Sequence, residues 1–219
     1  MNTNWFGFIT YLAENRETFF EKLIDHLIIT GSAVALAIVI ALPLAVLASR
    51  VRALAAPLTW ITSIGQTIPS LAVLALALPL LGIGRPAALF ALTITAILPI
   101  FLNAYTGIVG VSRAITDAAR GMGTSDAQRL WLVDLPLASP VIWTGIQTAT
   151  VQTVAAATLA AFIGGGGLGD LILLGLTRVD PTVLLAGAVP VALLAFAADI
   201  LMGWLRRLVV PAGLRIAAR

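Results

Sequence analysis

The stretch from Asp117 to Pro136 reads DAARGMGTSDAQRLWLVDLP and is bordered on both sides by long apolar segments. It belongs to a polar region, 110–136, that carries three arginines and three aspartates. Ionised side chains are costly inside a bilayer, so this region cannot sit in lipid. We therefore expect a solvated loop between two membrane-spanning helices.

The local pattern predicts a compact helical structure within this loop. Ser125 to Gln128 has the spacing of a capping box, in which the serine oxygen accepts from the Gln128 amide and the Gln128 side chain reaches back. Gly123 permits a sharp backbone turn before it, and Pro136 can open the next span as its first helical residue. A short helix with exposed Leu130 and Trp131 would fit a groove on another protein.

Composition makes the bilayer the solvent of most of the chain. Of the 219 residues, 60% are hydrophobic and 11% are charged, and the mean hydropathy is +1.04. With no cysteine and one histidine, we expect no disulfide, no thiolate nucleophile and no metal site. The basic residues stand at the ends of apolar segments and form no stripe, so nucleic-acid binding is not expected.

Five apolar segments are long enough to cross the hydrocarbon core, which takes about 20 helical residues. The predicted fold class is therefore all-α, a polytopic membrane protein with five transmembrane helices. The expected spans are 27–47, 57–81, 86–109, 137–163 and 183–204.

The arginines predict the orientation, because Lys and Arg near span ends are retained in the cytoplasm. If the loop 110–136 is cytoplasmic, most basic residues share its side, namely Arg50, Arg52, Arg113, Arg120, Arg129, Arg206, Arg207, Arg215 and Arg219. Only Arg16, Lys22, Arg85 and Arg178 then lie outside. We expect the N-terminus outside and the tail 210–219 in the cytoplasm.

The first 26 residues carry four acidic side chains and no unbroken apolar run, so a cleaved signal peptide is not expected. Their apolar residues, among them Trp5, Phe8, Phe19 and Leu23, recur at helical spacing. This pattern predicts an amphipathic helix, lying in the membrane interface or packed against the spans.

The loop motif resembles that of the permease subunits of ATP-binding-cassette (ABC) importers: Glu-Ala-Ala, three residues, Gly, nine residues, Ile, one residue, Leu-Pro. Asp117 stands for the usual glutamate and Val133 for the isoleucine, and every other anchor is in register. The resemblance implies a type I importer permease fold whose short helix seats in the ATPase subunit. It assigns this role to Asp117, Ala118, Ala119, Gly123, Ser125, Asp126, Ala127, Gln128, Arg129, Leu130 and Trp131.

The resemblance extends over about Leu23 to Leu208 and is greatest to the permeases of glycine betaine, carnitine and choline importers. Three stretches carry it: 65–72, Leu98 to Ile100 with Asn103 and Gly107, and 163–170. It implies a non-catalytic subunit of the bacterial cytoplasmic membrane that binds no cofactor itself. The implied partners are two ATPase subunits carrying ATP and Mg, a second permease copy or homologue, and an external solute-binding protein. Amino-acid importers share the five-span plan and are the alternative, followed by a secondary transporter.

Polar residues within the spans are the candidates for lining a solute path or, alternatively, for hydrogen-bonding between helices. They are Gln66, Thr67, Ser70, Asn103, Tyr105, Thr106, Thr144, Gln147, Thr148 and Gln152. Asp199, deep in the last span, is expected to pair with a cytoplasmic arginine or to reach toward water, and a role in gating or coupling is the functional alternative.

A glycine-rich run, 164–169, has the Gly-x-Gly-x-x-Gly spacing of dinucleotide sites but follows no strand, so that function is excluded. We expect Gly164, Gly166, Gly167 and Gly169 to turn the chain tightly at the outer membrane face, before a short helix near 171–174. An outer gate or receptor contact is the functional alternative for this loop. An enzyme is disfavoured because no catalytic cluster is visible.

Overall fold

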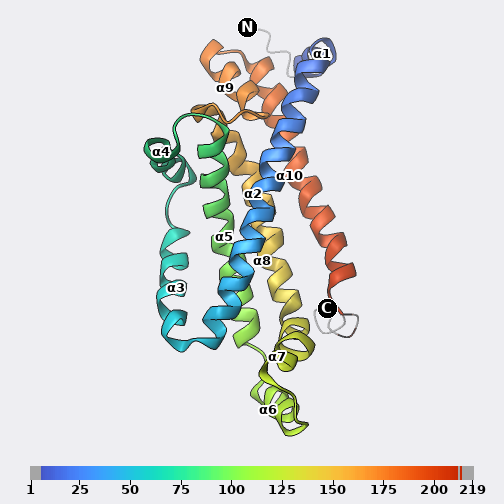
Figure 1. Cartoon of the computed structure of the whole chain (residues 1–219). Helices are drawn as coiled ribbons and strands as arrows, with labels where there is room; N and C mark the ends of the chain where they lie inside the picture. Colours follow the sequence, from blue (N-terminus) through green and yellow to red (C-terminus); the bar gives the residue numbers. More distant parts are fainter. Residues whose placement is uncertain (1–5, 212, 214–219) are drawn as a thin grey trace.

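The computed structural model describes residues 6–211 and 213, and these residues form helices and no strand. Long helices α2, α5, α8 and α10 run side by side, with α1 and α9 at one end of the molecule and α6 and α7 at the other (Figure 1). Trp5 and most of the predicted tail, including Arg215 and Arg219, lie outside the described residues. The two ends are named below the α1/α9 end and the α6/α7 end.

Four stretches of helix in the described chain are long and apolar enough to cross a membrane. They are α2 (Arg16–Arg50), α5 (Arg85–Val109), the run 126–163 that contains α8 (Leu135–Ala156) with the 3-10 segment η2 (Ala157–Ile163), and α10 (Pro181–Val209). They correspond to the first, third, fourth and fifth predicted spans. The all-helical, polytopic prediction is confirmed at this level.

The second predicted span, 57–81, is not one straight helix. It consists of α3 (Arg52–Gly65) and α4 (Ser70–Leu81), whose axes differ by 105° across a four-residue break. Pro69 caps α4 in an extended conformation that a helix cannot continue through. The pair counts as a fifth span only if the two halves cross together.

The N-terminal segment is divided differently from the predicted boundary at residue 26. Helix α1 (Gly7–Glu14) ends at Asn15, and α2 then continues without a break from Arg16 through the first apolar segment. Tyr11, Phe19 and Leu23 pack against a cluster formed by α9 (Gly169–Arg178) and α10. Packing against the spans is thus the alternative that this structure favours.

Alanines form the contact between α2 and the helices beside it. Ala37, Ala41 and Ala45 recur every four residues along α2, are fully buried, and share a cluster with Ala104 of α5. Small side chains on one helix face let two backbones approach closely, which is the main packing device in a bilayer. The four-residue alanine repeat is visible in the sequence, although it was not used above to predict helix packing.

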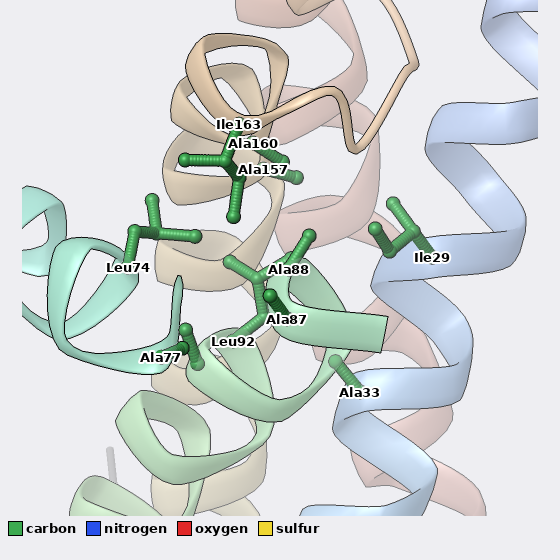
Figure 2. Packing of buried hydrophobic residues seen from close by; sticks show 11 residues of the cluster. Ile29, Ala33, Leu74, Ala77, Ala87, Ala88, Leu92, Ala157, Ala160 and Ile163 are labelled. Carbon is green, nitrogen blue, oxygen red and sulfur yellow. The ribbon is translucent and has the colours of Figure 1, made fainter. Parts of the chain in front are cut away.

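A second cluster of small residues joins the α1/α9 half of the same helices to the broken pair. Figure 2 shows Ala33 of α2, Ala88 of α5, Leu74 and Ala77 of α4, and Ala160 of η2 converging on one volume. Helix α4 is therefore held against α5 and η2, while α3 runs beside α5. This arrangement places the break between α3 and α4 alongside α8.

Candidate functional site

The predicted loop folds as α6 (Arg113–Gly121), a tight turn, α7 (Asp126–Arg129) and a π-helical segment, η1 (Leu130–Asp134). Gly123 has φ +83°, a left-handed conformation that side chains with Cβ disfavour, as its predicted turn role requires. The hydroxyl of Thr124 donates to the Ala119 carbonyl at 2.8 Å and fixes the turn to α6.

The predicted capping box is confirmed. The Gln128 amide donates to the Ser125 hydroxyl oxygen at 3.2 Å, and the Ser125 amide donates to the Gln128 side-chain oxygen at 2.9 Å. Two amide donors at the start of α7 are thereby satisfied without help from the spans. Pro136 lies in the first turn of α8, one residue after the helix start at Leu135, so it is placed at the opening of this span as predicted; η1 joins α7 to α8 without a break.

The residues assigned to ATPase contact differ in exposure. Asp117, Ala118, Asp126, Ala127 and Gln128 are exposed. Trp131 is also exposed, at 69% of its surface.

Three assigned residues are less accessible. Ala119 and Arg129 are buried, and Leu130, which was expected to be exposed, is half-buried. The start of α7 and Trp131 form an accessible knob at the α6/α7 end, where Asp117 and Ala118 of α6 are exposed as well.

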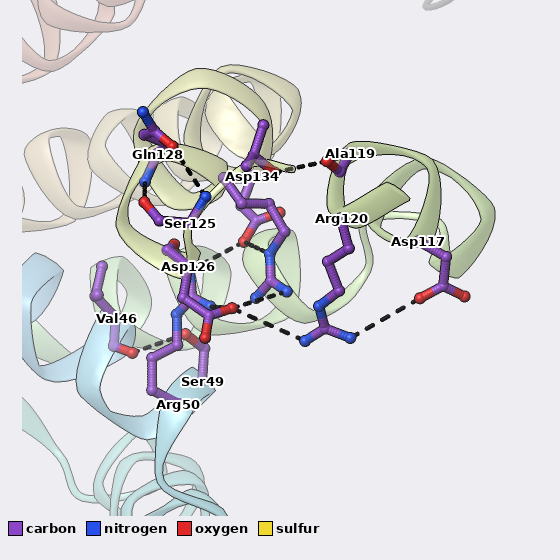
Figure 3. Close-up of polar contacts among 12 residues, drawn as sticks. Val46, Ser49, Arg50, Asp117, Ala119, Arg120, Ser125, Asp126, Gln128 and Asp134 are labelled. Carbon is purple, nitrogen blue, oxygen red and sulfur yellow. Dashed lines mark hydrogen bonds and ion pairs between the residues drawn. The ribbon is translucent and has the colours of Figure 1, made fainter. Parts of the chain in front are cut away.

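An ion-pair cluster supports this knob from within (Figure 3). Asp134 is only 4% exposed, and its Oδ2 accepts from Nη2 of Arg50 at 3.1 Å and from Nε of Arg129 at 3.2 Å. Arg129 also pairs with Asp126 at 3.2 Å, and Arg120 lies 3.9 Å from both Asp126 and Asp117. A buried carboxylate is tolerated because opposite charge surrounds it.

Sequence reasoning missed the two central members of this cluster. In the sequence, Arg50 indicates only the orientation of the chain, and Asp134 is only one of the three aspartates of the loop. An arginine at the end of a span and an aspartate at the start of another give no signal of proximity, since 84 positions separate them. The second oxygen of Asp134, Oδ1, is buried and has no hydrogen-bond partner among the described residues.

A pocket of about 510 Å³ opens where α3 and α4 break apart. It brings together three predicted path residues, Gln66, Ser70 and Gln152. The remaining wall comes from α5, α8, η2 and the break, and consists of Gly65, Ile68, Thr95, Leu98, Pro99, Thr153, Ala155, Ala156, Thr158 and Leu159. The lining from the described chain is polar in places and contains no charged side chain.

The other path candidates do not line this pocket. Thr67 faces a separate hollow beside Trp60, while Asn103 donates to the Pro99 carbonyl of its own helix at 2.8 Å. Tyr105 stacks on Phe101 with ring centroids 6.1 Å apart. Thr106 faces a smaller hollow beside Gly107, and Thr148 is half-buried outside the pocket.

Two further candidates on α8 are committed to other contacts. Thr144 donates to the Pro140 carbonyl of its own helix at 3.0 Å. Gln147 donates to Oδ1 of Asp199 at 2.7 Å, so the hydrogen-bond partner of this carboxylate is an amide, in place of the arginine that was one of the two alternatives.

The glycine-rich loop lies at the α1/α9 end, against the start of the long helices. Gly164, Gly166 and Gly167 have φ between +72° and +88°, so the tight turning that was predicted is present. Gly169 opens α9, the short helix expected after the loop, where its backbone closely approaches Thr158. The loop packs against α2, since a Cβ on Gly167 would lie 3.0 Å from Nδ1 of His26.

Charged pairs fix α2 to its neighbours beside this loop. Lys22 pairs with Asp170 of α9 at 2.7 Å, and Asp25 pairs with Arg85 of α5 at 3.0 Å. His26 is fully buried, with Nε2 3.0 Å from the Val154 carbonyl of α8. At the α1/α9 end, α2 therefore has polar contacts with three helices, α5, α8 and α9.

Comparison with protein families identifies the chain. Residues 33–211 match the model of the binding-protein-dependent transport system inner membrane component. The chain belongs to this family. The predictions of an ABC-importer permease subunit, of a bacterial inner-membrane location and of a transport component without catalytic activity are thereby confirmed.

Curated relatives in this family match the chain over nearly all of its length. The choline transport system permease protein OpuBB of Bacillus subtilis is 42% identical, with 94% of this chain and 95% of the relative covered. The osmoprotectant import permease protein OsmW of Salmonella typhimurium is 38% identical, with 94% and 99% covered.

Solved structures extend the likeness to the fold. An inward-facing crystal structure of the MetNI methionine ABC transporter contains a chain with a TM-score of 0.80 and 22% identity. The alignment covers 90% of this chain and 99% of that one. The type I importer permease fold expected from the loop motif is thus present.

Proposed function

We propose that this family member is the membrane-spanning permease of an ATP-driven importer for a small quaternary-ammonium osmoprotectant such as glycine betaine, choline or carnitine. The observation that carries the proposal is the capped knob at the α6/α7 end, formed by the start of α7 and Trp131. It projects an exposed aromatic side chain among charged and amide groups, a surface suited to a groove on an ATPase subunit.

The proposed orientation puts the α6/α7 end in the cytoplasm. Arg50 ends α2, Arg206 and Arg207 end α10, and α6 and α7 carry three more arginines at the same end of the bundle. Arg16, Lys22, Arg85 and Arg178 belong to the α1/α9 end. This asymmetry supports a cytoplasmic α6/α7 end under the positive-inside tendency, with the N-terminus outside.

We infer that the solute passes through the pocket at the α3/α4 break. Its volume of about 510 Å³ is typical of small-molecule sites, which measure about 300–1,000 Å³. Gln66, Ser70 and Gln152 offer neutral donors and acceptors that can contact a solute weakly enough to release it. A betaine carries a quaternary ammonium and a carboxylate, so its near-zero net charge suits a lining without ionised groups.

The proposed assembly has two ATPase subunits, which bind ATP and Mg, beneath two permeases. The second permease is another copy of this chain or a homologue. A solute-binding protein would deliver the cargo at the α1/α9 end, where the glycine loop and α9 are available as gate or receptor contact. The substrate class rests on the names of the relatives at 36–42% identity, among them choline, carnitine and glycine betaine permeases.

Amino-acid import is the second candidate, since the fold is shared with a methionine transporter. The two are separated by reconstituting the permease with its ATPase and binding protein and measuring uptake of radiolabelled choline. We expect ATP-dependent uptake that excess glycine betaine inhibits and excess methionine does not. Inhibition by methionine alone, or uptake driven by an ion gradient without ATP, would overturn the proposal.

A further inference from the structure

Arg50, the last residue of α2, contacts both ends of the segment 126–134. Its Nη2 donates to the carboxylate of Asp134 at 3.1 Å and to the carbonyl of Asp126 at 3.4 Å, and its Nη1 lies 3.9 Å from the Asp126 carboxylate. Asp126 opens α7 and Asp134 closes η1. One planar guanidinium therefore holds the first and last residues of the segment 126–134, which contains the proposed ATPase contact.

The position of Arg50 connects this contact to the pocket. Val51 joins α2 directly to α3, and α3 ends at Gly65, which lines the pocket. A helix of 14 residues is about 20 Å long at 1.5 Å per residue, so α3 alone spans the distance between the Arg50 corner and the break. The distance from the knob to the solute path is thus bridged by one ion pair and one short helix.

We propose that Arg50 is a positioning residue that makes the corner between α2 and α3 move with the segment 126–134, so that the ATPase opens and closes the pocket at the α3/α4 break. This inference rests on the proposed docking of that segment to the ATPase. Arg50 itself contacts neither solute nor nucleotide in this scheme. Its role is to transmit displacement through a contact between two elements.

The local charges make this contact separable from the folding of the segment. Arg129 holds Asp134 and Asp126 from within the segment, at 3.2 Å each, independently of Arg50. The capping box and the Thr124 bond also remain when Arg50 is replaced. Arg50→Ala therefore removes the connection to α2 while the knob keeps its own internal bonds.

The first test measures solute uptake per ATP hydrolysed in the reconstituted complex. For Arg50→Ala we expect this ratio to fall about two- to thirtyfold, the range for losing one contact in a coupling network, while ATPase binding is retained. Arg50→Lys should restore part of the ratio, because a point charge can still reach Asp134 but cannot bridge both carboxylates.

The matched control is Arg207→Ala. Arg207 is also an arginine near the end of a long helix, α10, but it is exposed and has no ion pair among the described residues, so its replacement should leave the ratio unchanged. An unchanged ratio in Arg50→Ala, or an equal fall in both variants, would overturn the inference.

The second test measures the distance between α3 and η1, whose response to ATP should not depend on Arg50 if Arg50 only stabilises the fold. The chain has no cysteine, so spin labels can be placed at Leu54→Cys on α3 and Leu132→Cys on η1 without other changes. The label distance should be the same with and without trapped ATP when Arg50 is present, and should change on ATP trapping in the Arg50→Ala background. A shift on ATP trapping with Arg50 present would contradict joint movement.

These outcomes separate the inference from the function on which it rests. If the unaltered complex shows no ATP-dependent uptake, the proposed function fails. If the unaltered complex transports and Arg50→Ala transports with the same ratio, only the positioning role fails.

Discussion

Arg50 and Asp134 are 84 positions apart in the chain, yet Nη2 of Arg50 donates a 3.1 Å hydrogen bond to Oδ2 of Asp134. The bond ties the end of the first long helix to the start of the helix that follows the loop. Asp134 is buried, so this pair is screened by salt much less than the exposed pairs of Arg120 nearby. The proposed ATPase contact is thus braced against the membrane bundle from inside.

The capping box predicts how two substitutions of Ser125 change the stability of the start of α7. Ser125→Ala removes the acceptor for the Gln128 amide and should destabilise the start of α7 by about 1 kcal/mol. Ser125→Asp keeps an acceptor at the cap and should retain the helix. Faster hydrogen exchange at the Gln128 amide in Ser125→Ala, with protection in Ser125→Asp, is the expected result, and similar protection in both would contradict the role of the cap.

The left-handed turn predicts that alanine substitutions at Gly121 and Gly123 have different effects on binding to the ATPase subunit. Gly123→Ala places a Cβ at φ +83°, at a cost of about 1–2 kcal/mol, which corresponds to an about five- to thirtyfold loss of affinity for the ATPase subunit. Gly121→Ala is the control, because that glycine is helical and its Cβ would meet no atom within 4 Å. Equal affinities of the two variants for the ATPase, measured in detergent, would argue against the turn as a docking element.

The pocket predicts which α8 side chain contacts solute. Gln152→Leu keeps the size of a pocket-lining residue but removes its donor and acceptor, and should raise KM for uptake about two- to tenfold. Thr144→Val alters a residue outside the pocket whose hydroxyl bonds within its own helix, and should leave KM unchanged. The path assignment would be wrong if Thr144→Val raised KM and Gln152→Leu did not.

The alanine contact of α2 predicts that a larger side chain on this helix face destabilises the protein. Ala41→Leu inserts extra carbons where Ala41 is fully buried between helices and should destabilise the protein by about 1–3 kcal/mol. Val39→Leu, on the exposed side of the same helix, should have little effect. Thermal unfolding of the purified permease checks both, and an unchanged Tm for Ala41→Leu would show that α2 is not closely packed.

Sequence patterns predicted those features of the fold and of the candidate site that depend on residues close together in the chain. The capping box at Ser125, the turn at Gly123 and the short helix after Gly169 follow from bonds and dihedral angles within a few positions. Four of the five spans follow from apolar length alone. These features require no knowledge of which helices pack together.

What the sequence did not predict depends on tertiary contacts or on competing signals. The segment 57–81 contains no charged residue, so its length indicates one span, although the polar Gln66 and Thr67 followed by Pro69 mark the break. The pairs formed by Arg50 with Asp134 and by Gln147 with Asp199 join distant positions that carry no periodic signal. The burial of His26 likewise depends on where the glycine loop lies.

The central claim is that the knob at the start of α7 contacts an ATP-hydrolysing subunit in the cytoplasm. Ala127→Cys gives this cysteine-free chain a single exposed thiol, and Val179→Cys gives one at the other end as a control. A short cross-linker should join Ala127→Cys, and not Val179→Cys, to the ATPase subunit in sealed membranes. The account would be contradicted if Ala127→Cys formed no such product, or if a membrane-impermeant reagent labelled it from outside.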